Sequence, residues 1–314
     1  MSCVVTAADR DLFRRCLRAW DLGARMRSSY EPLERSNTVR LDQALRSALR
    51  VYYFPGMWSW SRDVVRPLAI RELDASLAEC DDEDRALGRH SLECYFEWAP
   101  ALDTFSSIRA DTPFEVSVPD PDQEGCDLVT RTGETVRYQG RIDLLVTDSA
   151  GENWIVEHCI RRASSAASPD PERDERAATH CATWEMFFLG MTIAGSIYNE
   201  IDVDASAASE PSPFRRVVVR RSPQTLSGAR RRLALEARAM VEAARSPGPL
   251  PPSLSRENCA YCDYRRPCIT LSERRDVAPI LEGGYRKRAI EAVPEPGLAG
   301  RGTWGPALSA RSRG

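Results

Sequence analysis

The sequence predicts an α/β protein with a central mixed β-sheet flanked by helices. Amphipathic helical patterns fill the first third of the chain, and apolar residues then alternate with a period of two through the middle. A helix–strand–helix succession follows, ahead of a cysteine-rich segment near the end. Helices that precede a strand meander and then alternate with strands favour one mixed sheet with helices packed on it.

Four amphipathic helices are expected before the sheet. Thr6 is a suitable N-cap for the first, and Pro67 interrupts or starts the third. The expected helices span residues 6–25, 38–54, 60–80 and 82–99.

The expected strands are separated by turn-type clusters such as "PDPDQEG" and "DSAGEN". They span residues 113–119, 126–132, 135–148 and 153–162, with a short fifth strand at 215–221. Helices are expected at 176–199 and 222–245, and loops at 164–175 and 200–213.

These elements divide the chain into four parts. An N-terminal helical region (1–112) precedes the α/β core (113–245). The proline-rich stretch "SPGPLPPS" then leads into a cysteine-rich segment (246–275). The last part (276–314) is expected to be a partly disordered tail, because glycine, proline, serine and arginine dominate it from about residue 290.

Composition indicates a soluble, cytoplasmic protein. Of the 314 residues 28% are charged and 42% hydrophobic, and no apolar run approaches the roughly 20 residues that span a bilayer. Thiols stay reduced in the cytoplasm, so the ten cysteines do not predict a disulfide framework. A net charge of −3 excludes a global basic field, and nucleic-acid binding would need a local groove. The arginine-rich stretches 214–221 and 229–238 are candidates, and a solvated arginine face explains each equally well.

The segment "ENCAYCDYRRPC" places three cysteines at metal-ligand spacing. Cys259 and Cys262 are separated by two residues, and Cys268 follows after five more. A closed thiolate site needs a fourth ligand. Four cysteines suit both tetrahedral Zn²⁺ and an iron–sulfur cluster, and spacing does not distinguish the two. The other cysteines at positions 80, 94, 126 and 181 are expected to be small buried hydrophobes.

Two carboxylates are expected to meet on one hairpin. If the turn between the strands 135–148 and 153–162 is centred near Ala150, Asp143 lies opposite Glu157. Alternation puts both on a polar face and leaves Ile142, Leu144 and Val146 on the core face. Carboxylates this close repel unless a cation lies between them, and Mg²⁺ or Mn²⁺ would suit. Two solvated acids on an exposed face are the alternative.

Several segments, in order, resemble the RecB-like nucleases of the PD-(D/E)XK superfamily, which implies a restriction-endonuclease-like core. They are "FRRCLRAWDL", "GRHSLECYFEW", "FEVSV", "GRIDLLV", "WIVEHC" and the cysteine segment. In that family a helical histidine and three strand carboxylates bind the catalytic metal. The resemblance assigns these roles to His90, Glu115, Asp143 and Glu157.

The cysteine segment resembles the iron–sulfur branch of this family, which includes AddB-type and CRISPR-associated members. The resemblance implies a 4Fe–4S cluster held by Cys16, Cys259, Cys262 and Cys268, with Zn²⁺ as the competing metal. Cys3 is a second candidate for the fourth ligand, although it lies outside the matched segment.

The sequence departs from the family at the catalytic lysine. That position is Cys159, which carries no positive charge to stabilise a phosphate. Arg141 and Arg161 are on the same expected face and could supply charge, although arginine transfers protons poorly. The family's Gln-x-x-x-Tyr helix is matched only by His180 and Trp184. His158 is expected to face the core as a structural histidine.

Two functions therefore remain. The first is a Mg²⁺- or Mn²⁺-dependent DNA nuclease, an exonuclease by resemblance, with an altered active site. The second is a catalytically inactive nuclease fold that serves as a DNA-binding or assembly module, stapled by its metal cluster. The resemblance implies DNA as partner, single-stranded or at an end, and a helicase, recombination or CRISPR partner. No membrane partner is expected.

Overall fold

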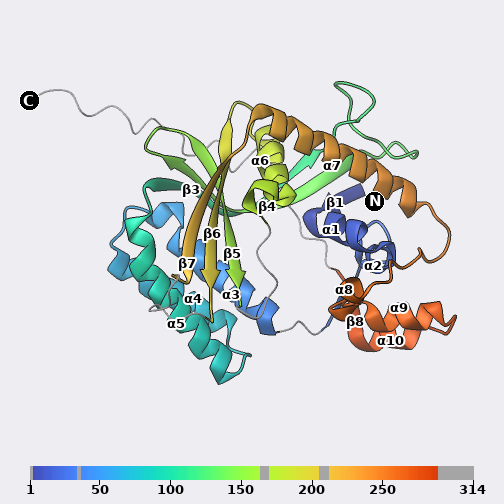
Figure 1. The fold of residues 1–314 in the computed structure, drawn as a ribbon, viewed down its shortest axis with the longest axis horizontal. Helices are drawn as coiled ribbons and strands as arrows, with labels where there is room; N and C mark the ends of the chain where they lie inside the picture. Colours follow the sequence, from blue (N-terminus) through green and yellow to red (C-terminus); the bar gives the residue numbers. More distant parts are fainter. Residues whose placement is uncertain (1–2, 34–36, 163–169, 205–211, 289–314) are drawn as a thin grey trace, which may run out of the picture.

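A six-stranded mixed sheet forms the centre of the computed structural model, which describes residues 3–33, 37–162, 170–204 and 212–288 (Figure 1). The strand order is β1-β4-β5-β6-β7, and β3 pairs with the other edge of β4. The strands are β1 (Cys3–Thr6), β3 (Phe105–Ser117), β4 (Val136–Asp148), β5 (Asn153–Arg161), β6 (Ile193–Asp202) and β7 (Phe214–Arg220). The predicted α/β class with a mixed central sheet is confirmed.

Strand β4 has two different partners along one edge. Its first half pairs in parallel with β1, and its second half pairs antiparallel with β5, from Leu144↔Val156 to Thr147↔Asn153. This register is the one that a turn near Ala150 predicts. The β4–β5 ladder ends before it reaches Asp143, so the two strands part there and form a fork.

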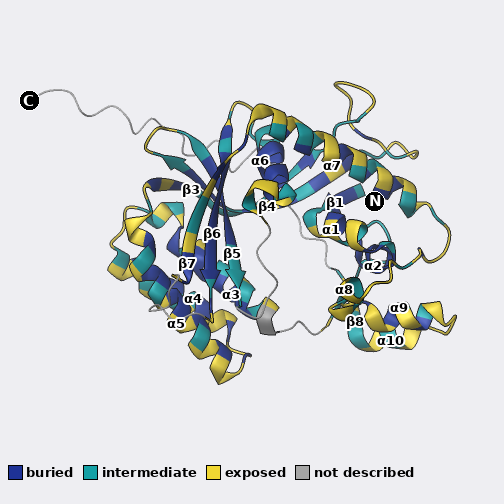
Figure 2. Cartoon of the chain, viewed as in Figure 1, coloured by how far each residue is buried: buried dark blue, intermediate teal, exposed yellow. Residues whose placement is uncertain are grey.

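Helices cover both faces of the sheet, and a separate hydrophobic core lies between the sheet and the helices on each face (Figure 2). One face carries α1 (Ala7–Arg15), α2 (Leu17–Gly23), α6 (Glu175–Phe187) and α7 (Pro223–Ala244). The other carries α3 (Asn37–Tyr52), α4 (Arg62–Ser76) and α5 (Asp82–Trp98). The expectation of one packed and one polar face is wrong. Leu145 and Ile155 are fully buried under the first layer, and Leu144 and Val156 under the second.

The alternation in β4 changes phase at Asp143. Tyr138 and Ile142 belong to the core beneath α6 and α7, whereas Leu144 and Val146 belong to the core beneath α3 to α5. The predicted core face, which put Ile142 with Leu144 and Val146, is therefore wrong at its first residue. A strict period of two does not anticipate such a switch.

Local capping matches the prediction at the first helix. The Thr6 hydroxyl accepts a hydrogen bond from Asp9 N, and the Asp9 carboxylate accepts one from Thr6 N, so the two form a capping box. The helix does not continue to residue 25. Cys16 has an extended backbone (φ −163°) and separates α1 from α2.

The expected helix at 176–199 is wrong in its second half. The helix α6 ends at Phe187, and Gly190 turns the chain with a φ of +90° into the strand β6. Strand β6 lies between β5 and β7 and is buried on both faces, so its apolar residues do not alternate. Its residues 200–202 fall in the expected loop.

The structure corrects three further expectations about the strands. Residues 126–132 form isolated bridges with neighbouring residues and no strand of the sheet. The strand β3 begins at Phe105, eight residues before the expected start, and β1 adds a strand at the N-terminus. The region 1–112 therefore contributes strands to the sheet as well as helices. Short 3₁₀ turns lie at Pro55–Met57 (η1), Ala99–Ala101 (η2) and Pro171–Arg173 (η3).

The cysteine segment folds against the N-terminal helices. The segment contains α8 (Arg256–Ala260) and α9 (Arg265–Ser272), and the residues that follow it form α10 (Ala278–Gly284) and β8 (Tyr285–Lys287). Strand β8 pairs antiparallel with β2 (Tyr30–Pro32). The first part of the expected tail is therefore ordered, whereas 289–314 and the expected loop residues 164–169 and 205–211 lie outside the described residues. Among the helices described, none is both long and apolar enough to cross a membrane.

Candidate functional site

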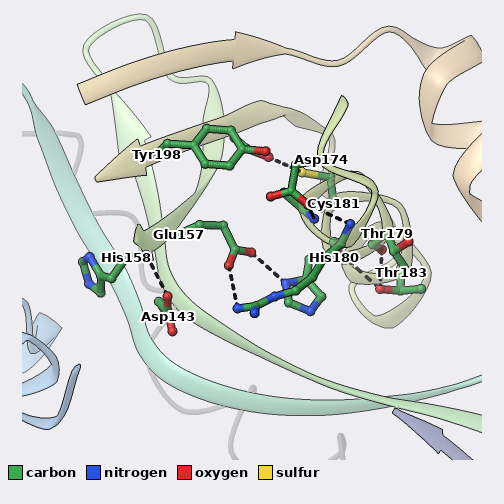
Figure 3. Close-up of polar contacts among 12 residues, drawn as sticks. Asp143, Glu157, His158, Asp174, Thr179, His180, Cys181, Thr183 and Tyr198 are labelled. Atoms are coloured by element: carbon green, nitrogen blue, oxygen red, sulfur yellow. Dashed lines mark hydrogen bonds and ion pairs between the residues drawn. The ribbon is translucent and has the colours of Figure 1, made fainter. Parts of the chain in front are cut away.

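An arginine closes the fork at Asp143. The Asp143 Oδ2 accepts hydrogen bonds from His158 N at 2.8 Å and from Arg46 Nη1 at 2.5 Å (Figure 3 shows the first). Arg46 Nη2 also donates to the main-chain oxygen of His158 at 2.5 Å. The guanidinium, which comes from α3, thus bridges a carboxylate of β4 and a carbonyl of β5.

Glu157 lies on the other side of the fork and has two polar partners of its own. Its Oε1 lies 2.7 Å from His180 Nδ1, and its Oε2 lies 3.3 Å from Arg176 Nη2 (Figure 3). Both partners come from α6, which packs on this face of the sheet. The Glu157 side chain is buried, so these contacts satisfy a charge that water does not reach.

Both carboxylates are held in the ionised form. Burial by itself would raise the pKa of Asp143, but the nearby Arg46, with the His158 amide, holds that pKa below its usual range. Burial likewise acts to raise the pKa of Glu157, and His180 with Arg176 more than offsets it. The pKa of Arg46 is raised: burial alone would lower it, and Asp143 and Asp42 outweigh that effect.

A cavity of about 470 Å³ opens beside Glu157. Five arginines face it together with four acidic residues, so its lining is close to neutral. Its charged lining residues are Asp11, Arg14, Arg46, Glu157, Arg161, Arg173, Asp174, Glu175 and Arg176.

Cys159, at the lysine position of the resemblance, lines this cavity as a neutral thiol. Burial, and then the negative charge of Glu157, raises its pKa to about 12. The positive charge next to the carboxylates comes from the helices, through Arg46 and Arg176. Of the two arginines proposed from the sequence, Arg161 lines the cavity, whereas Arg141 pairs with Asp111 at 2.6 Å.

The structure does not bring His90 to the fork. Gly88, Leu92 and Tyr95 form the buried face of α5, and His90 lies nearly opposite them, exposed to solvent. Its ring nitrogen Nε2 lies 3.7 Å from Cys94 Sγ, and it shares no hydrogen bond or ion pair with the fork carboxylates within the described residues. Its expected role as a metal ligand is therefore not supported by its position.

Glu115 is also apart from the fork. It lies opposite Gln139 in the β3–β4 ladder, four residues along β4 from Asp143, which corresponds to about 13 Å. Its carboxylate pairs with Arg137 at 2.8 Å. Of the four expected metal ligands, only Asp143 and Glu157 come together.

Sequence reasoning missed the two arginines of the fork. Arg46 follows Asp42 by one helical turn, and Arg176 lies in the first turn of α6. In the sequence both look like ordinary surface arginines. They reach the carboxylates of the fork only because α3 and α6 pack on the sheet. In the sequence His180 is only a partial match to the Gln-x-x-x-Tyr pattern of the resemblance, and the structure places it in contact with Glu157.

His158 is confirmed as a structural histidine. It is buried, its Nδ1 accepts a hydrogen bond from Asn199 Nδ2 at 3.0 Å, and its ring stacks on Tyr53. Burial lowers its pKa to about 4, so it is neutral at physiological pH. It fixes the strand that carries Glu157 from the opposite face of the sheet.

The four cysteines named from the sequence line one cavity of about 170 Å³. Cys16 arrives from the break between α1 and α2, and Cys259, Cys262 and Cys268 arrive from the C-terminal segment. Ser253 N donates to Cys16 Sγ at 3.3 Å and ties the two segments together. Cys3 lies in β1 and is not part of this cavity. Among the remaining cysteines the expected burial holds for Cys80 and Cys181, whereas Cys94 is half-buried and Cys126 is exposed.

The surroundings of these thiols fit an anionic metal–thiolate group. Burial raises the pKa of Cys268, and the charges of the other three cysteines raise it further. Arg18 is the opposing charge, and its Nη1 is buried with no hydrogen-bond partner among the described residues. A buried guanidinium with a spare donor beside four cysteines suits a negatively charged metal–thiolate cluster.

The spacing of the thiols bears on which metal fits. Around one Zn²⁺, bonds of 2.3 Å would hold neighbouring sulfurs about 3.8 Å apart. Within the described residues, no three His, Cys, Asp or Glu side chains are grouped to hold a metal ion. The four thiols that line the cavity therefore form no closed tetrahedral site in this structure, and their arrangement favours neither Zn²⁺ nor an iron–sulfur cluster.

Comparisons with known proteins give little beyond this geometry. No protein-family model matches the sequence, and no curated protein matches it. Among solved structures, the crystal structure of SSO0001 is similar at 13% sequence identity, over 74% of this chain and 85% of that one. Its TM-score is 0.31, which is too low to assign a fold or a function.

Proposed function

We propose that this chain is a catalytically inactive DNA-binding module on a nuclease-like fold, in which Arg46 takes the place of the catalytic metal ion. The main observation behind this proposal is that Arg46 donates hydrogen bonds to both Asp143 Oδ2 and the His158 carbonyl oxygen, each at 2.5 Å. A carboxylate and a neighbouring carbonyl are oxygen ligands that a divalent ion would use. Here a permanently charged side chain of the protein holds both.

The rest of the site supports this proposal. Glu157 is also neutralised from within the protein, by His180 and Arg176. Of the expected ligands, His90 and Glu115 lie elsewhere, and Cys159 provides no charge. A metal ion at this place would have to displace Arg46, which would lose its ion pair with Asp143 and its hydrogen bond to the His158 carbonyl and keep only the pair with Asp42.

The cavity beside Glu157 suits the phosphates of a DNA backbone. Arginine presents a planar fork of donors that matches phosphate oxygens in two-point contacts. Arg173 and Arg176 are the more exposed arginines of the cavity, and Arg173 extends furthest into solvent with 88% of its side chain accessible. Backbone contacts of this kind bind DNA without chemistry and depend on salt.

We further propose that Cys16, Cys259, Cys262 and Cys268 hold a 4Fe–4S cluster as a structural staple. The cluster would supply no chemistry to the fork, because it belongs to a separate cavity. Its thiolate bonds would join the N-terminal helices to the C-terminal segment, which already contact one another through Ser253 and Asn258.

A metal-dependent nuclease is the second candidate, and one observation favours it. Asp143 and Glu157 lie at the same fork, and both have lowered pKa values, so both are ionised and able to bind a cation. In this case Mg²⁺ or Mn²⁺ would displace Arg46, and Arg176 or Arg161 would stabilise the phosphate.

Digestion and binding assays on the anaerobically purified protein separate the two candidates. We expect single- and double-stranded DNA to bind without cleavage in Mg²⁺ or Mn²⁺. Arg173→Ala should weaken binding several-fold, whereas Arg137→Ala, outside the cavity, should not. Metal-dependent cleavage by the wild type that Asp143→Asn abolishes would establish the nuclease and overturn the inactive module. The double variant Arg46→His, Cys159→Lys adds a neutral metal-binding side chain and a positive charge at the fork. DNA cleavage by this variant would show that these two groups are what the wild type lacks.

A further inference from the structure

Tyr261 projects from the cysteine segment into solvent. Its side chain is 93% exposed, and it lies between Cys259 and Cys262, both of which line the cysteine cavity. Tyr264, three residues later, is buried, donates its hydroxyl to Tyr30 O at 2.8 Å and stacks on Tyr285. The segment therefore has one tyrosine that anchors it and another that it presents on a fixed backbone.

Unpaired positive charge surrounds this segment. Arg15, Arg256 and Arg265 are exposed, and none of them forms an ion pair with any described residue. Most other arginines are paired, as Arg14 is with Glu236 and Glu175. Of the three acidic residues of the same segment, Glu273 pairs with Arg275, whereas Glu257 and Asp263 are exposed and form no ion pair with any described residue. These two reduce the positive charge without cancelling it.

Apolar side chains accompany the exposed tyrosine. Leu254 is 75% exposed and Ile269 45% exposed, and both line the mouth of the cysteine cavity together with Arg265. An exposed aromatic ring with apolar neighbours and unpaired arginines is the composition of surfaces that bind single-stranded nucleic acid.

The end of α1 connects this surface to the fork cavity. Arg14 lines the fork cavity, and the next residue, Arg15, accepts a hydrogen bond on its carbonyl from Asn258 Nδ2 at 3.1 Å. In Figure 1, α8 lies directly below α1 and α2. The Arg15 charge also acts on the pKa of Cys262, so two consecutive arginines border the two regions.

We infer that the cysteine segment is a single-strand binding surface, on which a DNA base stacks against Tyr261 while Arg15 and Arg265 contact the adjacent phosphates. The inference rests on the proposed DNA binding and adds to it a second contact region, with Tyr261 as the residue on which a base stacks. Stacking requires an unpaired base, because the faces of duplex bases are already covered. It is tolerant of sequence, because every base has such a face.

Fluorescence anisotropy of the full-length protein with labelled oligo(dT) and with a duplex of equal length tests this. Tyr261→Ala should weaken oligo(dT) binding by between about 5-fold and about 100-fold. Tyr261→Phe should retain it, because the ring is kept, and duplex binding should be unaffected in both. Leu189→Ala, which removes a side chain that is 90% exposed elsewhere, is the matched control.

The failures of this inference and of the proposed function are distinguishable. Oligo(dT) binding that responds to Arg173→Ala but not to Tyr261→Ala would overturn the stacking surface and leave the DNA-binding module in place. Absence of binding to either DNA would overturn both. Photo-crosslinking of an iodouracil-substituted strand adds a direct readout: we expect the adduct at Tyr261, and an adduct confined to other residues would contradict the inference.

Discussion

The fork and the cysteine cavity are both expected from the sequence to bind metal, but they differ in how the protein balances the charge of their side chains. At the fork, Arg46, Arg176 and His180 neutralise the two carboxylates from within the chain. At the cysteine cavity, burial and the neighbouring thiols raise the pKa of Cys268, and only Arg18 opposes them. The first region has its cations built in, whereas the second would receive positive charge only from the proposed cluster.

This difference shows that the presence of ligand residues does not by itself define a metal site. Asp143 and Glu157 have the residue types that a divalent ion needs, and they are close enough for the charge of Asp143 to act on the pKa of Glu157. The decisive property is whether the protein leaves their charge uncompensated. By that criterion the fork is an ion-pair network, and the cysteine cavity is the metal centre that we propose for this chain.

The largest effect should come from the cysteine cavity. Cys16→Ser removes one of four cluster ligands, so the anaerobically purified variant should lose its brown colour, its iron and its sulfide. Structural metal sites contribute on the order of 10 kcal/mol to small domains, so the thermal midpoint should fall sharply. Metal analysis and calorimetry measure both effects. Cys126→Ser, at an exposed cysteine, is the control, and colourless wild-type protein with stoichiometric zinc would contradict the iron–sulfur assignment.

The second effect tests the built-in cation. Arg46→Ala leaves Asp143 buried without its partner and should cost about 3–5 kcal/mol in the free energy of unfolding. Mg²⁺ or Mn²⁺ should then stabilise the variant in a concentration-dependent manner, and not the wild type.

Arg50→Ala is the matched control for this variant. Arg50 lies one turn further along α3 and pairs with Glu72 at the surface, so its loss should cost less than about 1 kcal/mol and create no metal response. Equal stabilisation of the wild type by metal would show that Arg46 does not occupy the ion's place.

A smaller effect should appear as a pH dependence. The pKa of His158 is lowered to about 4, whereas in the unfolded chain it is about 6.5. Between these values the unfolded state binds a proton that the native state does not, so stability is complete above pH 6.5 and falls as the pH drops toward 4. The loss amounts to about 3 kcal/mol. Urea unfolding at pH 7, 6 and 5 measures it, and a wild-type slope unchanged by His158→Gln would contradict the assignment.

The smallest effect is expected at Glu115. Its pair with Arg137 is at the surface, so Arg137→Ala should change the unfolding free energy by less than about 1 kcal/mol. Glu115→Gln should leave DNA binding unchanged. A large loss of binding or of metal response in Glu115→Gln would return this residue to the functional site.

The fold class and much of the local structure could be predicted from the sequence. Thr6 as an N-cap, the hairpin centred near Ala150 and the facing of His158 toward the core follow from capping preference, turn chemistry and alternation. The strand β6 could not, because a strand buried on both faces has no alternation, and its apolar run reads equally well as the end of a helix.

The sequence by itself determined the chemistry that is available: four cysteines at ligand spacing, two carboxylates on one hairpin, and no lysine beside them. The convergence of Cys16 with the C-terminal cysteines was predictable as well, through a resemblance that covers both segments. Only the tertiary structure decided what each set does. Arg46 and Arg176 reach the carboxylates because α3 and α6 pack against the sheet near the fork, and His90 misses them because it points away from the packed side of α5. Charge compensation depends on distances of a few ångströms between segments that are far apart in the chain. Local sequence patterns do not reveal which of these segments come into contact.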